Sequence, residues 1–104
     1  TIPREHLRYR LRPVGYGANA DVYMYNGHYK AGTESDDRAQ RAYESELVRA
    51  NADALGQGAN IIVAGDLNVQ NSGEAMYQTL LASGNGQVFD PINRPGNWND
   101  NAAF

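Results

Sequence analysis

Apolar and polar residues alternate near the start of the chain, over residues 7–12. Leucine and tyrosine at the odd positions and arginine at the even positions give the period of two that is typical of a half-exposed strand. We expect the apolar side chains to face a core and the arginines to form a solvated outer face; phosphate binding by these arginines is the alternative. A second strand is predicted over residues 20–29, which are rich in aromatic residues, and its nearness in sequence predicts antiparallel pairing with the first.

The clearest helix is predicted over residues 35–55. Thr33 or Ser35 can cap it, and acidic residues at its amino end suit the helix dipole. An apolar stripe at helical spacing is expected to face the core, and charged residues are left largely for the other faces. The stripe comprises Tyr43, Leu47, Val48, Ala50, Ala54 and Leu55, and the charged set comprises Arg38, Arg41, Glu44 and Arg49.

The apolar run at 61–64 predicts a strand buried on both faces, ending near Gly65. A shorter helix is predicted next, with Asn71 and Glu74 arranged like a capping box. A further short strand is predicted at residues 88–89. A helix between two strands indicates a crossover connection in an α/β domain. Two helices cover such a sheet only in part, so we expect residues 1–104 to be the central part of one larger domain.

Composition narrows the class of protein. The 104 residues are 41% hydrophobic with seven tyrosines, enough for a packed core. A net charge of −3 gives no general attraction for nucleic acid, although Arg4, Arg8, Arg10 and Arg12 cluster early. The chain has no cysteine and therefore no disulfide framework or thiolate metal site. No apolar run approaches the ~20 residues of a membrane span, and no signal peptide is visible.

Two pairs of polar residues follow predicted strands. Asp66 and Asn68 come after the buried strand, and Asn26 and His28 stand at the end of an earlier one. Residues two positions apart in an extended chain share a face, so each pair is expected to converge on one point. Together they suit phosphodiester cleavage: a carboxylate activates water, amides hold a phosphate oxygen, and an imidazole protonates the leaving group. The alternatives are an Asx turn for the first pair and a structural histidine beside an ordinary turn residue for the second.

The order of these motifs resembles the endonuclease/exonuclease/phosphatase superfamily. The resemblance rests on residues 28–31 after a strand, Arg41 and Glu44 in a helix, and the Gly-Asp-Leu-Asn motif of residues 65–68, and it covers roughly residues 20–82. It implies a four-layer α/β sandwich, two β-sheets flanked by helices, and hydrolysis of phosphoesters with Mg²⁺, or with Mn²⁺ or Ca²⁺. Arg41 and Glu44 are then structural residues of the helix that packs on the sheet.

The same resemblance implies roles for single residues. Asp66 positions or activates the attacking water and is a possible second-site metal ligand, Asn68 orients the water or the phosphate, and His28 assists the leaving group. Asn26 and Trp98 are expected to bind substrate or phosphate, with simple packing as the alternative for Trp98. Residues 94–101 resemble a segment of secreted bacterial members, which implies an extracellular protein.

Departures from the family pattern limit what this chain does alone. The family's principal metal-ligand glutamate and its closing Asp-His pair are not found here, and neither Glu5 nor His6 has the context to substitute. We therefore expect residues 1–104 to be inactive alone and the intact parent to be a nuclease-like phosphodiesterase. A non-catalytic binding or surface module of the same fold is the alternative, as is a hydrolase of the sphingomyelinase or inositol-phosphatase type. The expected partners are a phosphodiester substrate, with nucleic acid as one candidate, and the remainder of the domain.

Overall fold

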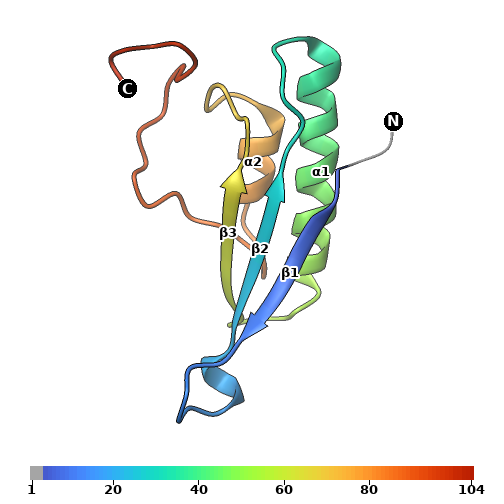
Figure 1. The fold of residues 1–104 in the computed structure, drawn as a ribbon, viewed down its shortest axis with the longest axis vertical. Coiled ribbons are helices and arrows are strands. Elements are labelled where there is room, and N and C mark those ends of the chain that lie inside the picture. Colours follow the sequence, from blue (N-terminus) through green and yellow to red (C-terminus); the bar gives the residue numbers. More distant parts are fainter. Residues whose placement is uncertain (1–3) are drawn as a thin grey trace.

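The computed structural model describes residues 4–104, which form one three-stranded sheet with both helices packed on the same face (Figure 1). The strands lie in chain order, with β1 antiparallel to β2 and β2 parallel to β3. The predicted α/β class and the antiparallel first pair are thereby confirmed. The elements are β1 (His6–Leu11), the 3-10 turn η1 (Ala18–Ala20), β2 (Val22–His28), α1 (Ser35–Asp53), β3 (Asn60–Asp66) and α2 (Ala75–Leu81).

The core lies between the sheet and the helices. Tyr25 of β2 and Tyr29 just beyond it contribute from the sheet side, and Ile61 and Val63 of β3 pack against them. The helices contribute the remaining buried apolar side chains, which are Val48, Ala52, Met76, Tyr77 and Leu80. Since neighbouring residues of a strand point to opposite faces, the residues between these core positions lie on the other side of the sheet.

That other side of the sheet has no covering layer among residues 4–104. Register pairing puts Leu7, Tyr9 and Leu11 of β1 in rows with residues 22, 24 and 26 of β2, and Ile62 of β3 lies in the middle row. These four apolar side chains remain 44–47% exposed. The expectation that β3 is buried on both faces, and that the apolar side of β1 faces a core, is therefore wrong for this part of the chain. The arginines of β1 are exposed, as predicted, but they lie on the helix side of the sheet and not on its outer face: Arg8 is the register partner of the core residue Tyr25 and donates to Asn51 of α1.

The buried face of α1 also differs from the prediction. Tyr43 and Leu47 of the expected apolar stripe are both 45% exposed, and of that stripe only Val48 is fully buried. The helix instead buries a polar face, because its charged side chains find partners on other elements. That buried face comprises Gln40, Arg41, Glu44, Ser45, Val48, Arg49 and Ala52.

The helix starts were also predicted imperfectly. The residue that caps α1 is Glu34, not Thr33 or Ser35, and Asp37 accepts a hydrogen bond from its backbone N–H at 3.1 Å. The residue that caps α2 is Glu74, not Asn71. The Asn71 side chain instead accepts a hydrogen bond from the backbone N–H of Gly73, and the Glu74 side chain accepts one from Arg41 of α1. The strand expected at residues 88–89 does not form. No helix within residues 4–104 is long and apolar enough to cross a membrane.

A cluster of charged side chains lies at the end of the sheet where β1 ends and β2 begins. Asp21 is almost fully buried and accepts hydrogen bonds from Arg10 and Arg12, whose Nε atoms both lie 2.6 Å from its carboxylate oxygens. Asn60 joins the cluster by donating to the backbone oxygen of Asp21. The guanidinium of Arg12, opposed by burial and helped by Arg10, lowers the pKa of Asp21 to about 2. This end of the sheet is therefore held by an ionised carboxylate.

We predict that Asp21 stabilises the fold in a pH-dependent way. Because its pKa is lower in the folded chain than in the unfolded one, its contribution is complete above about pH 4 and is lost as the pH falls toward 2. The difference in unfolding free energy between wild type and Asp21→Asn, measured with urea, should shrink over that range. The same step should be smaller in an Arg12→Gln background. An equal difference at pH 2 and pH 6 would contradict this account.

Candidate active site

His28 and Asp66 lie side by side where β2 and β3 end. They are register partners on neighbouring parallel strands, and both strands point the same way (Figure 1). The His28 Nε2 atom is 3.5 Å from the Asp66 Oδ2 atom, and the two side chains are 60% and 64% exposed. The predicted juxtaposition is confirmed. It arises because the crossover through α1 brings the carboxyl ends of both strands to one edge of the sheet.

A shallow hollow of about 370 Å³ surrounds this pair on the uncovered side of the sheet. Asn26 lines it together with His28 and Asp66, so the expected shared face of Asn26 and His28 is confirmed. Glu5 lines it as well: it comes one residue before His6, the register partner of Gly27, which brings it level with His28. The sequence analysis set Glu5 aside. Its position two residues before Leu7, on the same strand face, was the available signal.

Two glycines set the close spacing of the strands next to the pair. Gly27 and Gly65 are register partners, and a Cβ atom on Gly65 would lie 2.2 Å from the backbone oxygen of Gly27. Gly65 also has a φ of +130°, which side-chain-bearing residues rarely adopt. The strand continues through this residue to Asp66, so Asp66 is the last residue of β3 and not part of the loop.

Asn68 does not point into the hollow with Asp66. It has a φ of 52°, in the left-handed region, and its Nδ2 donates to the backbone oxygen of Tyr29 at 2.7 Å. Its backbone N–H donates to the Asp66 Oδ1 atom at 3.0 Å. The expectation that Asp66 and Asn68 share one face is wrong, because the chain turns between them. Asn68 instead joins the ends of β2 and β3 and orients the carboxylate of Asp66.

Trp98 lies away from the His28–Asp66 hollow. Its ring packs edge-on against Tyr77 of α2, with centroids 5.2 Å apart, and its Nε1 donates to the backbone oxygen of Arg94. Backbone hydrogen bonds from Trp98 and Asn99 to Gln70 fix this segment beside the loop after β3. These contacts match the packing alternative. A substrate contact by Trp98 stays a prediction.

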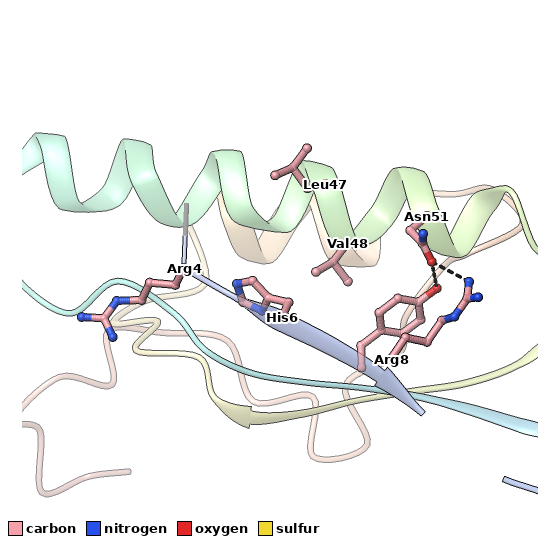
Figure 2. A pocket seen from close by; sticks show the side chains of 7 residues that line it. Arg4, His6, Arg8, Leu47, Val48 and Asn51 are labelled. Atoms are coloured by element: carbon pink, nitrogen blue, oxygen red, sulfur yellow. Dashed lines mark hydrogen bonds between the residues drawn. The ribbon is translucent and has the colours of Figure 1, made fainter. Parts of the chain in front are cut away.

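A second hollow, of about 240 Å³, lies between β1 and α1 (Figure 2). Arg4, His6 and Arg8 flank it, and Leu47 and Val48 form part of its apolar side. Two of its polar groups are already engaged, since Arg8 donates to Asn51 and His6 contacts Glu44. Neither Arg8 nor the Asp21-bound arginines Arg10 and Arg12 line the His28–Asp66 hollow. They are therefore not its phosphate-binding groups.

The described residues do not form a metal site by themselves. Asp66 and Glu5 are the two carboxylates that line the hollow, and no group of three or more potential ligands occurs within residues 4–104. Hard cations such as Mg²⁺ need several oxygen ligands. This chain therefore offers at most part of a coordination shell, and no chemical step of the described residues is assigned to a metal.

The arrangement can carry out proton transfer at one exposed point. A carboxylate next to an imidazole supplies an acceptor and a donor within reach of one bound molecule. The neighbouring amide of Asn26 adds a hydrogen-bond donor on the same strand face. Tyr29 adds no further acid, because burial, assisted by the charge of Glu44, raises the pKa of its hydroxyl to about 12.

We predict that Asn68 stabilises the strand ends through both its backbone and its side chain. Asn68→Ala should lower the unfolding free energy by about 2 kcal/mol: about 1 for the lost hydrogen bond to Tyr29 and about 1 for a left-handed alanine. Asn68→Gly should cost about 1 kcal/mol, because glycine tolerates the backbone conformation. Urea unfolding measures both. Equal costs for the two variants would show that the positive φ carries no penalty.

Comparison with protein-family models, curated proteins and solved structures finds no match to this chain. The chemistry assigned to the site therefore depends on the positions of its own residues. Among these, the His28–Asp66 pair lies at the ends of parallel strands, where open α/β sheets bind ligands.

Proposed function

We propose that this chain supplies one side of the active site of a divalent-metal-dependent phosphoester hydrolase, most simply a nuclease-like phosphodiesterase. The observation that carries the proposal is the exposed pair of His28 and Asp66, 3.5 Å apart at the carboxyl ends of adjacent parallel strands. Ligands of open α/β sheets bind at such strand ends. The resemblance of residues 28–31 and 65–68 to motifs of the endonuclease/exonuclease/phosphatase superfamily supports the same chemistry.

The proposed roles follow from the chemical type of each group. Asp66 orients a water molecule and accepts its proton as the water oxygen attacks phosphorus. The bond between phosphorus and the leaving oxygen breaks, and protonated His28 gives its proton to that oxygen. Asn26 donates to a non-bridging phosphate oxygen, where negative charge develops. Asn68 acts through Asp66, by holding the carboxylate with its backbone N–H.

The intact domain is proposed to complete both the metal site and the fold. Asp66 is one oxygen ligand for Mg²⁺ or a similar cation, and further ligands come from outside the described residues. The uncovered sheet face supports a second layer, because contiguous exposed apolar side chains such as Tyr9, Leu11 and Ile62 are typical of an interface. A second β-sheet packed at about 10 Å would cover this face and complete the four-layer sandwich.

The substrate class is proposed from the phosphoester chemistry that members of the resembled superfamily share. Nucleic acid is the first candidate, and phospholipid head groups and inositol phosphates are alternatives on the same core. A non-catalytic module is the competing function. It is favoured by one observation, which is that no three-ligand metal cluster lies within residues 4–104. We also propose that the protein is extracellular, and this rests only on the resemblance of residues 94–101 to secreted bacterial members of the superfamily.

We predict that the intact polypeptide containing this chain hydrolyses phosphodiesters with Mg²⁺ and loses this activity when the pair is removed. His28→Ala and Asp66→Ala should each lower kcat/KM by about 10² or more, as expected for general acid–base groups. Rates should be measured on bis(p-nitrophenyl) phosphate, plasmid DNA, RNA, sphingomyelin and inositol phosphates, with and without EDTA.

The matched control for this assay is Asp36→Ala, which removes an exposed carboxylate at the start of α1, outside the hollow. It should retain the wild-type rate. If His28→Ala and Asp66→Ala also retain full rate, or if none of the substrates is hydrolysed, the proposal fails and the non-catalytic module takes its place.

A further inference from the structure

A buried ion pair lies between α1 and the segment that precedes α2. The side chain of Arg41 is wholly buried, and its Nε donates to the Glu74 Oε1 atom at 2.8 Å. Its Nη1 donates to the backbone oxygens of Lys30 and Gly32, at 2.9 and 2.8 Å. One guanidinium therefore binds a carboxylate and two carbonyl groups of the loop that follows β2.

Glu74 extends this contact to the loop that follows β3. Its Oε2 atom accepts a hydrogen bond from the backbone N–H of Gln70 at 2.7 Å. The side chain of Gln70 in turn donates to the backbone oxygen of Gly32 at 3.1 Å. The arginine–glutamate pair and the side chain of Gln70 thus connect the loops after β2 and β3. We call Arg41, Glu74 and Gln70 the loop clamp.

Glu44, one turn further along α1, holds the same loop from its other side. Its Oε2 atom accepts a hydrogen bond from the backbone N–H of Lys30 at 3.1 Å, and its Oε1 atom lies 2.9 Å from the His6 Nε2 atom. Lys30 therefore has its N–H fixed by Glu44 and its carbonyl oxygen fixed by Arg41. The charged face of α1 fixes the backbone immediately after β2.

The backbone groups that the loop clamp binds follow the His28–Asp66 pair closely in the sequence. Lys30 comes two residues after His28, and Gln70 comes two residues after Asn68. Between the clamp and the pair, Asn68 donates through its side chain to Tyr29 and through its backbone to Asp66. A shift of either clamped loop would therefore move the donor that orients the carboxylate of Asp66.

Stability alone does not account for a wholly buried ion pair. Removing two charges from water is costly, and apolar residues of similar volume often replace such a pair without loss of stability. The guanidinium, by contrast, presents several donors in a rigid plane and so fixes its partners in direction as well as distance. The loop clamp is better suited to fixing geometry than to adding stability.

We propose that Arg41 is a positioning residue for the His28–Asp66 pair, acting through the loops after β2 and β3. Its catalytic consequence rests on the proposed hydrolase function, whereas its effect on the geometry of the strand ends does not. Arg41 touches neither side chain of the pair in the hollow. It controls how the Asp66 carboxylate is held relative to His28.

The test compares Arg41→Met/Glu74→Met, which removes both charges, with Arg49→Met. Arg49 is the matched control: it is a buried arginine on the same helix, but it donates to the backbone oxygen of Thr79 in α2 and contacts Asp53. Two quantities are measured in the intact polypeptide. They are hydrogen exchange of the Asn68 backbone amide by NMR, and kcat and KM for bis(p-nitrophenyl) phosphate.

We expect the double variant to exchange the Asn68 amide at least tenfold faster and to lose at least tenfold in kcat with KM unchanged. Arg49→Met should leave both values within twofold of wild type. If the double variant does not fold, Arg41→Lys, which keeps the charge but lacks the planar fork, is held to the same criteria. Unchanged exchange, or unchanged kcat in an active enzyme, would overturn the proposal. If the wild type hydrolyses nothing, the proposed function fails and the exchange rates alone decide whether Arg41 positions the pair.

Discussion

The buried contact between Arg41 and Glu74 is the interaction on which the arrangement of this structure depends. It places a charge pair where a helix normally presents apolar side chains, and it brings α1, the segment preceding α2 and the loops after β2 and β3 into one network. The apolar core beside it is modest: three tyrosines with one valine, one alanine, one methionine and one leucine. Hydrophobic burial therefore supplies cohesion, while the charged network fixes where the ends of the strands lie.

The geometry of the candidate site depends on the parallel pairing of β2 and β3 and on two glycines. A crossover connection makes β2 and β3 parallel, so their carboxyl ends coincide and bring together residues 38 positions apart in the chain. Gly65 lets β2 and β3 approach where a Cβ atom would collide with the backbone of Gly27, and Gly27 leaves room for the ring of His6. The polar pair occupies the last residues of both strands, at the border of an apolar face that nothing covers among residues 4–104.

The sequence predicted the three strands and two helices that form and the His28–Asp66 juxtaposition, because strand periodicity and the order of elements are local signals; the strand predicted at residues 88–89 does not form. It mispredicted the buried face of α1, because hydrophobic spacing marks Tyr43 and Leu47 as core. The partners that bury Arg41 and Glu44 lie far along the chain, at Glu74 and His6. The role of Asn68 was also missed. An extended geometry was assumed for residues 66–68, and only the structure shows the left-handed turn there.

The parallel pairing of β2 and β3 has a consequence for folding order. The β1–β2 hairpin pairs residues that lie near one another in the chain, whereas pairing β3 with β2 requires closing a longer loop that contains α1. Contacts between distant residues form slowly, because the loop between them must be ordered first. We therefore expect His28 and Asp66 to meet late, after most of the hairpin and helix are in place. A partly folded chain would then present a sheet edge and an apolar face before His28 and Asp66 come together, and in a nascent polypeptide such exposed surfaces favour aggregation.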